Sequence, residues 1–296
     1  MSDRSPSEDS TGGAPATRSS PLPPATDSLI VASFFGILGA AVALTTTLAG
    51  DLGLVVITGS TLLGFGGGAL LGAGLVRFVP GLLAYLGGKK RRHLVIVLPA
   101  APFAVVGFAA IFGPFGTELG FASVGSMSTL VILGYALRAV ASTRYAETVT
   151  ADRSLQTCRW QPPRSPRMDA VLLVIWLGLA VVYAVAGDWL STLVWGTLGV
   201  LWLTTGLIEG RFQIDGLGTT PEIQIYETGF VKQRPLTSTF VSWKTVDHVR
   251  LRDDELVFDR GLFDTRLDRD ALESPDELLA AIESQLSDRT ATLPSS

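Results

Sequence analysis

The sequence LGLVVITGSTLLGFGGGALLGAGLV, residues 52–76, contains no charged side chain over 25 consecutive positions. A helix needs about 20 predominantly apolar residues to cross the hydrocarbon core of a bilayer. Buried helices of soluble proteins rarely run so long without a charge. This stretch therefore predicts a transmembrane helix, and the rest of the chain contains others like it.

Six intervals between charged residues have this character, and they hold 23, 25, 25, 19, 18 and 20 residues in chain order. An ionised side chain at the bilayer centre costs at least about 2.5–3.5 kcal/mol, so long charge-free intervals mark helices that cross the membrane. The sequence thus predicts a six-helix membrane domain over residues 28–209. The intervals lie between Asp27 and Asp51, Asp51 and Arg77, Arg92 and Glu118, Glu118 and Arg138, Asp169 and Asp188, and Asp188 and Glu209.

The composition agrees with this interpretation, because 47% of the residues are hydrophobic and only 17% are charged. Soluble domains carry about 25% charged residues, so the composition argues against an ordinary soluble enzyme. Residues 1–27 are rich in Ser, Pro and acidic residues and predict a disordered cytoplasmic tail. Residues 289–296 are expected to be a second flexible tail.

The Lys and Arg residues fall on one side of the predicted helices. With six helices, both tails and the even-numbered connections share a side. They hold all 23 basic residues, with 2 in the N-terminal tail, 5 over 77–92, 6 over 138–167 and 10 after residue 209. Since cytoplasmic loops are enriched in Lys and Arg, we expect a multi-pass protein of the cell membrane with both termini in the cytoplasm.

The connection 142–167 divides the six helices into four plus two. It contains the run 161–166, whose three prolines prevent continuous helix, and we interpret the connection as a cytoplasmic linker. The last two helices meet almost directly at Gly187 and Asp188, which predicts a tight antiparallel hairpin. The only cysteine, Cys158, lies in the linker, so no intrachain disulfide is expected.

Residues 210–288 have short alternating apolar runs, which predict a small antiparallel β domain in the cytoplasm. Ser274 and the residues that follow it have the pattern of a helix start. Leu278, Leu279, Ile282 and Leu286 would form the apolar stripe of that helix. The expected fold is therefore an α-helical polytopic membrane domain followed by a small antiparallel sheet that a C-terminal helix closes.

This C-terminal region resembles the pleckstrin-homology-like domains of prokaryotic membrane proteins. The resemblance depends on Tyr226-x-x-Gly229-Phe230, on Ser242-Trp243-x-x-Val246 and on the helix after Ser274. It covers about residues 211–288 and leaves the six helices unmatched. The resemblance implies a binding module without catalytic residues.

Two compositional features concern the source and the partners of the chain. It has 19 Arg against 4 Lys and 17 Asp against 10 Glu, which resembles the composition of haloarchaeal proteins. The region after Glu209 has 10 basic and 16 acidic residues, a net charge of −6. A domain of that charge is not expected to bind nucleic acid.

Two sets of residues are candidates for contacts. Small residues at every fourth position of the second predicted helix would let another helix backbone approach closely. Basic residues at the predicted cytoplasmic interface, and in one hairpin of the β domain, are candidates for contact with a partner or a lipid head group. The packing set is Ser60, Gly64, Gly68 and Gly72, and the contact set is Lys89, Lys90, Arg91, Arg92, Lys232 and Arg234.

The sequence assigns no special role to Arg138, to the two histidines or to the cysteine. Arg138 lies just at a predicted helix end, where its long side chain can reach the interface. His93, His248 and Cys158 have no spacing typical of a metal site. We expect no catalytic residue, no cofactor and no metal.

Two classes of function therefore stay open. The first is a non-enzymatic integral membrane protein that anchors or scaffolds through its cytoplasmic domain, with membrane lipid or a protein as partner. The second is a transporter or channel for an uncharged or small solute, with a regulatory C-terminal domain. Self-association into a homo-oligomer through the small-residue stripe is compatible with either class.

Overall fold

The computed structural model describes residues 25–113, 116–150, 154–161, 166–212, 219–246, 248–251, 255–259, 265–274, 276, 278–280, 282, 284 and 285. Within these residues, six helices are long and apolar enough to cross a membrane, and a small antiparallel sheet region accompanies them. Both features were predicted and are confirmed. The predicted tails lie outside the described residues, except that residues 25–27 already belong to the first helix.

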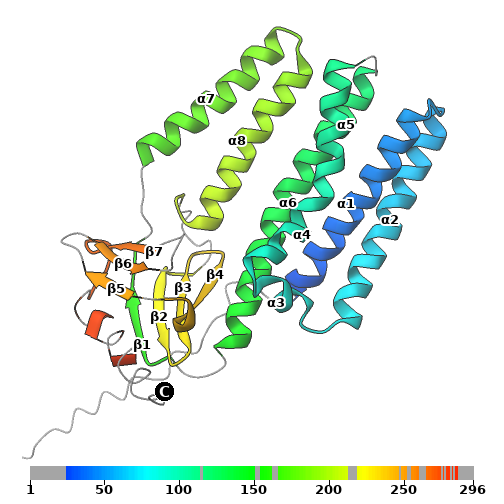
Figure 1. Ribbon diagram of the computed structural model, residues 1–296. Coiled ribbons are helices and arrows are strands. Elements are labelled where there is room, and N and C mark those ends of the chain that lie inside the picture. The colour runs from blue at the N-terminus through cyan, green and yellow to red at the C-terminus, as the bar shows by residue number, and fades with distance from the viewer. Residues whose placement is uncertain are drawn as a thin grey trace, which may run out of the picture.

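The helices stand side by side, and the strands gather at one end of them (Figure 1). In chain order the helical elements are α1 (Ala25–Ala49), α2 (Leu54–Phe78), α3 (Leu82–Gly87), η1 (Lys90–Arg92), α4 (His93–Val97), η2 (Leu98–Ala100), α5 (Ala101–Phe112), α6 (Thr117–Val149), α7 (Pro166–Val185) and α8 (Trp189–Glu209). The end of α2, the start of α3, the end of α6 and the start of α7 lie at the same end of the helices as the sheet, whereas α1 and α8 meet α2 and α7 at the far end.

Helices α1 and α2 pack at backbone distance, and glycine makes this approach feasible. A Cβ atom at Gly64 would overlap the carbonyl of Gly39, and one at Gly68 would overlap the carbonyl of Phe35. Gly72 meets the first half of α1 in the same way. Three residues of the predicted stripe therefore lie in this contact, while the hydroxyl of Ser60 bonds within its own helix.

The third apolar interval is not one continuous helix as the sequence predicted. It is divided into α4, η2 and α5 around Pro99 and Pro102, and it ends at Phe112. Proline removes a backbone donor and clashes with the preceding turn, so a break at these positions follows from the sequence.

The fourth long helix extends beyond its predicted end near Arg138. α6 continues to Val149 and has 33 residues. Residues 142–149 of the expected linker are thus helical, and Gln156–Arg159 form the strand β1. The helix ends at Val149, with Thr150 as its C-cap.

Helices α7 and α8 form the expected hairpin, with α7 on the outer side of α8 (Figure 1). Gly187 turns the chain with a φ of 76°, and Asp188 caps α8 by accepting a hydrogen bond from the Ser191 amide at 3.1 Å. Hydrogen bonds from Ser191 hold the pKa of Asp188 below its ordinary value. A salt bridge of 3.1 Å between Asp169 and Arg211 joins the other end of the hairpin.

The described strands form two antiparallel sheets. The four-stranded sheet has the order β1-β2-β3-β4, and the three-stranded sheet has the order β5-β6-β7. β1 lies before α7 in the chain but pairs with β2, with Cys158 opposite Ile223. The β domain predicted over 210–288 therefore also includes a strand from the expected linker. The other strands are β2 (Glu222–Tyr226), β3 (Gly229–Gln233), β4 (Ser238–Ser242), β5 (His248–Leu251), β6 (Glu255–Asp259) and β7 (Thr265–Asp268), with a short turn η3 (Trp243–Thr245) after β4.

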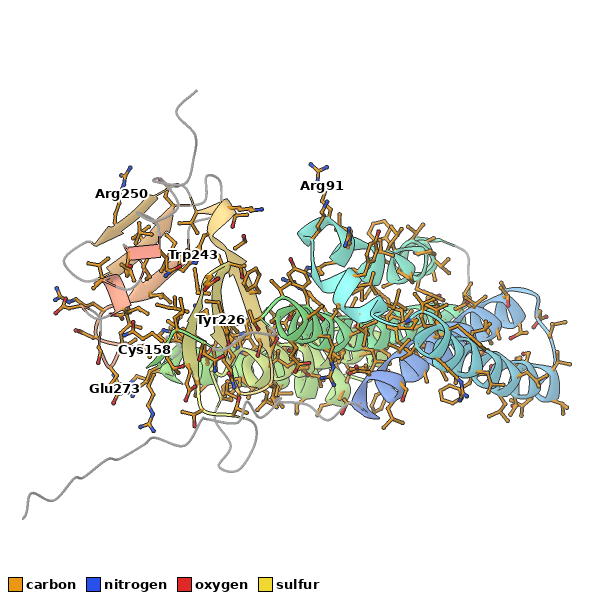
Figure 2. All side chains as sticks on the ribbon, turned by 90° about the horizontal axis from the view of Figure 1, so that it is seen from below. Arg91, Cys158, Tyr226, Trp243, Arg250 and Glu273 are labelled. Carbon is orange, nitrogen blue, oxygen red and sulfur yellow. The ribbon has the colours of Figure 1, made fainter. Side chains whose placement is uncertain are left out.

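The core of the β domain contains residues from both sheets and from the closing helix. Trp243 is only 3% exposed, packs on Phe230, and donates its ring N–H to the carbonyl of Tyr226 at 2.9 Å. Leu278 and Ile282 of the predicted closing helix are fully buried in the same core, whereas Leu286 lies outside the described residues. Figure 2 shows Cys158 and Trp243 inside this domain and Arg91 far away on the helical part.

Replacement of Trp243 by Ala should unfold the β domain, because loss of a buried aromatic costs about 3–5 kcal/mol. The single cysteine is a built-in probe, since Cys158 is 5% exposed in this core. We expect its labelling by a maleimide in the full-length protein to accelerate by about 100-fold or more. Trp189→Ala is the matched control, because Trp189 is exposed at the start of α8. Equal labelling rates in the two variants would contradict this account of the core.

Replacement of Gly68 by Leu should separate α1 from α2, because the new side chain would overlap the α1 backbone. Overpacking of this kind costs about 1–3 kcal/mol or more, so we expect a lower melting temperature in detergent. Gly67→Leu supplies the control, since a Cβ at Gly67 meets no atom within 4 Å. If both variants melt alike, the close approach does not stabilise the protein.

Candidate binding cavity between the helices and the sheet

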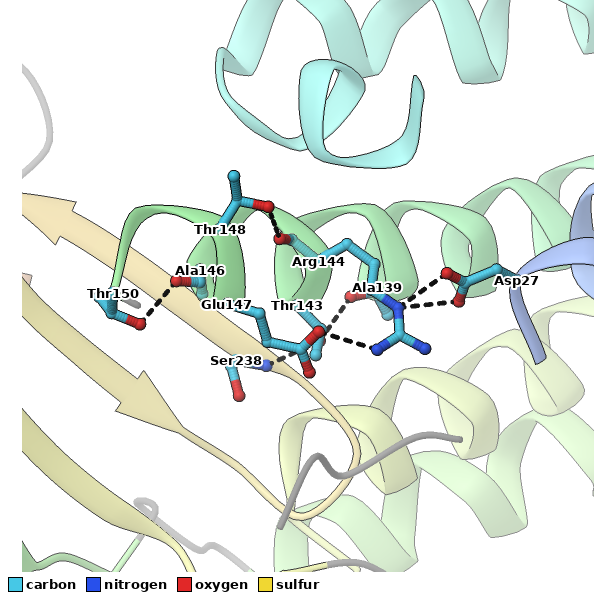
Figure 3. Close-up of polar contacts among 9 residues, drawn as sticks. All are labelled: Asp27, Ala139, Thr143, Arg144, Ala146, Glu147, Thr148, Thr150 and Ser238. Carbon is cyan, nitrogen blue, oxygen red and sulfur yellow. Dashed lines mark hydrogen bonds and ion pairs between the residues drawn. The ribbon is translucent and has the colours of Figure 1, made fainter. Parts of the chain in front are cut away.

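The C-terminal turns of α6 hold the edge of the four-stranded sheet through hydroxyl groups. The amide of Ser238 on the edge strand β4 donates to the Thr143 hydroxyl at 3.0 Å, and that hydroxyl donates to the carbonyl of Ala139 at 2.9 Å (Figure 3). Thr237 lies 3.1 Å from the Ser142 hydroxyl and donates to the Ala139 carbonyl at 3.3 Å. An edge strand needs partners for its backbone groups, and α6 supplies one here.

Apolar side chains complete this seam between α6 and the sheet. Tyr145 and Phe240 make an edge-to-face contact with ring centroids 6.1 Å apart. Ala146 is buried in one cluster with Tyr226 and Val231. The sheet is therefore fixed to the helix by polar and apolar contacts together.

An ion cluster attaches the start of α1 to the same helix. Arg144 donates to both carboxylate oxygens of Asp27, at 2.8 and 2.9 Å, and forms a second ion pair with Glu147 at 2.8 Å (Figure 3). All three side chains are mostly buried. The positive charge of Arg144 is thus neutralised within the fold.

A cavity of about 240 Å³ lies beside this seam, where the helices meet the β3–β4 turn. Gly87 forms part of its wall at backbone distance from Ala141 of α6. The turn is closed by a hydrogen bond of 2.8 Å from the Arg234 amide to Thr237. The lining residues are Gly87, Gly88, His93, Tyr135, Arg138, Ala139, Ser142, Tyr145, Ile208, Glu209, Arg234, Thr237, Thr239 and Phe240.

The cavity has two positive charges that are not neutralised. Within the described residues, neither Arg138 nor Arg234 makes an ion pair or a side-chain hydrogen bond, and both act electrostatically on the Tyr135 hydroxyl. Among the described residues, Glu209 is the only acidic one that lines the cavity, and it already accepts from Tyr135 at 2.9 Å and pairs with Arg211 at 3.3 Å. The electrostatics of the cavity therefore favour an anion.

A second cavity of about 190 Å³ is lined by Arg144, Asp27 and Glu147. Its basic group is the one that the ion cluster neutralises. It therefore lacks the free charge of the first cavity, which we take as the candidate site.

The structure separates the basic residues that the sequence grouped as contacts. Of the six, only Arg234 lines the cavity. Arg92 bonds to the Tyr85 carbonyl at 2.6 Å and stacks on its ring, while Lys89 and Arg91 are exposed elsewhere. The side chain of Lys90 lies outside the described part of the chain.

Lys232 is half-buried against the β domain, and its ammonium lies 4.0 Å from the centre of the Trp160 ring. Burial, helped by the nearby charge of Arg234, lowers the pKa of Lys232 from 10.5 to about 7. Lys232 is thus a poorly solvated cation in the sheet.

The sequence did not identify the other residues that line this cavity with Arg234. The position of Arg138 at a predicted helix end already explained its charge, and His93 lies at no spacing typical of a metal site. The buried Nε2 atom of His93 has no hydrogen-bond partner among the described residues. The sequence signal available was the spacing of Arg138 and Ser142, because residues four positions apart lie on one face of a helix.

Residues with guanidinium, hydroxyl and phenol groups line the cavity, and among the described residues its one carboxylate, that of Glu209, is paired. In the described ranges, His, Cys, Asp and Glu nowhere gather in a group of three that could hold a metal ion.

Comparisons with protein-family models, with curated proteins and with solved structures find no match to this chain.

Replacement of Thr143 by Val should loosen the seam while keeping the shape of the side chain. The Ser238 amide would then be buried without an acceptor, which costs about 1–3 kcal/mol. We expect hydrogen exchange at this amide to accelerate about tenfold or more. Thr148→Val is the control, because the exposed Thr148 hydroxyl bonds only to Arg144 of its own helix. Unchanged exchange in Thr143→Val would show that the seam does not depend on this hydroxyl.

Replacement of Lys232 by Met should stabilise the protein in a pH-dependent way. The folded pKa of about 7 lies below the unfolded value of 10.5, so the unfolded state binds more protons between these pH values. The wild-type stability therefore rises with pH through this window. In the variant, Met carries no charge and keeps a contact with the Trp160 ring, so its contribution does not depend on pH. We expect the melting temperature of the variant to exceed that of the wild type most at pH 7 and below, and the difference to shrink as the pH rises. A melting-temperature difference between Lys232→Met and the wild type that does not vary with pH would show that the buried charge of Lys232 is not its cause.

Proposed function

We propose that this chain is a non-enzymatic, multi-pass protein of the cell membrane that anchors or scaffolds through a cytoplasmic β domain. The observation that carries the proposal is the seam between α6 and β4. Ser238, Thr237 and Phe240 of the sheet contact residues 139–145 of a helix that also belongs to the membrane domain. Such a connection holds the β domain in one orientation, which is what an anchor for a partner requires.

The outward side chains of the helices support membrane insertion. Leu63 is 78% exposed, Phe78 82% and Val185 85%, on helices of high mean hydropathy. Apolar patches of this extent are rare on monomeric soluble proteins. A bilayer would cover them, with the connections rich in Lys and Arg, and the sheet, on the cytoplasmic side.

The strand arrangement supports the resemblance to pleckstrin-homology-like domains. Seven described strands in a four-plus-three arrangement are closed by helical residues around Leu278 and Ile282. The chain departs from a simple module in one respect, since α7 and α8 lie between β1 and β2. In our proposal this insertion gives the domain a second attachment to the membrane.

The sidedness of the membrane domain is the first test of the proposal. In a Cys158→Ser background, a membrane-impermeant maleimide applied to intact cells should label Asp188→Cys. Ser7→Cys and Ser296→Cys should be labelled only after permeabilisation, because both termini are placed in the cytoplasm. Labelling of residue 296 in intact cells would overturn the proposed topology.

Solute flux separates the proposal from the alternative of a transporter or channel. The purified protein in sealed vesicles should leave the permeability to glycerol and urea at the level of protein-free vesicles. Gly68→Leu is included as a disrupted control. Protein-dependent flux that is lost in Gly68→Leu would favour the transporter alternative.

A further inference from the structure

We propose that the cavity between α6, α8 and the β3–β4 turn binds the phosphate group of an anionic ligand through Arg138 and Arg234. The ligand class is a phosphate-bearing anion, either the head group of an anionic lipid or a small soluble phosphate. The inference rests on the proposed function where it places the cavity at the membrane surface. The charge and shape of the cavity do not depend on that placement.

The first argument is the uncompensated charge. Arg138 and Arg234 lie on one cavity of about 240 Å³ without an ion pair in the described part of the chain, while Arg144, Arg211 and Arg269 each have a carboxylate partner. Arginine binds phosphate through two parallel N–H donors, and such charge-assisted bonds are about twice as strong as neutral ones. Two guanidinium groups on one cavity therefore have the chemistry of a phosphate site.

The second argument is that the two arginines come from different parts of the fold. Arg138 belongs to α6, whereas Arg234 belongs to the turn that Thr237 attaches to Ala139 and Ser142. The seam thus brings two like charges to the wall of one cavity. An anion bound by both would bridge α6 and the β3–β4 turn, so its binding would strengthen the attachment of the sheet.

The third argument is the additional polar wall. Tyr145 and the exposed Thr239 line the same space, and each carries a hydroxyl group. Ser142 lines it too, but its hydroxyl already donates to the Ala139 carbonyl at 2.9 Å. Hydroxyl donors satisfy the remaining lone pairs of a phosphate, which presents more acceptor positions than two guanidinium groups fill. The volume suits a phosphate or a small head group and is below the range of about 300–1,000 Å³ that holds larger ligands.

The two sources of phosphate share this chemistry but differ in their route to the cavity. The wall includes Ile208 and Glu209 at the end of α8 and Gly87 and Gly88 at the end of the short apolar helix α3. In the proposed topology these ends lie at the membrane surface, where lipid head groups are concentrated. A soluble phosphate would enter from the cytoplasmic side.

The test uses the full-length protein in detergent and follows its melting temperature. The probes are a short-chain phosphatidylglycerol, the corresponding phosphatidylcholine, and inorganic phosphate at constant ionic strength. The variants are Arg138→Gln and Arg234→Gln, with Arg91→Gln as a matched loss of one exposed charge. Shielding of Cys158 from a maleimide verifies that each variant keeps its β domain folded.

We expect an anionic probe to raise the melting temperature of the wild type, and its apparent affinity to fall by about tenfold or more in Arg138→Gln and in Arg234→Gln but not in Arg91→Gln. Stabilisation by phosphatidylglycerol alone identifies the lipid as the source, and stabilisation by inorganic phosphate identifies a soluble ligand. No stabilisation by either anion, or equal affinity in all variants, would overturn the proposal. Such a result would not contradict the proposed function, because the sidedness of the membrane domain is tested separately by cysteine labelling.

Discussion

The length of α6 is the constraint on which the remaining structure depends. Its 33 residues extend over roughly 50 Å at about 1.5 Å per residue, whereas a bilayer core of about 30 Å takes about 20 residues. The excess turns at the C-terminal end carry Ala139, Thr143, Arg144 and Ala146. These residues hold the sheet edge, the start of α1 and one wall of the cavity. One continuous helix thus links the apolar bundle to the β domain.

The helical part was largely predictable from sequence because its physical cause is local. Charge-free intervals mark helices, glycine at every fourth position marks a close helix contact, and Gly187 with Asp188 marks a tight turn. The division of the third helix at Pro99 and Pro102 was also within reach of the sequence, since proline acts on its own helix. The closing helix of the β domain had a readable start and apolar stripe for the same reason.

The seam and the cavity were not predictable, because they bring together residues that are distant in the chain. The hydrogen bond between Thr143 and Ser238 spans 95 positions. A helix that exceeds the bilayer thickness looks from sequence like a helix followed by a linker, since charges reappear at Arg138 in either case. β1 was not predicted, because four residues are too few to show a clear alternation of apolar and polar side chains. Its partner β2 also lies beyond two further helices in the chain. Lys232 and Arg234 are two residues apart, yet Lys232 is half-buried beside Trp160 while Arg234 lines the cavity.

The position of β1 has a consequence for biosynthesis. Since the chain is made from its N-terminus, β1 leaves the ribosome before α7 and α8, and its partner β2 follows only after both helices. In the proposed topology, the antiparallel pairing of Cys158 with Ile223 waits until the hairpin has crossed the bilayer twice and returned the chain to the side where β1 remains. If only one of the two helices crossed the bilayer, β1 and β2 would lie on its opposite sides and could not pair. In the proposed topology, completion of the sheet therefore requires that α7 and α8 cross together.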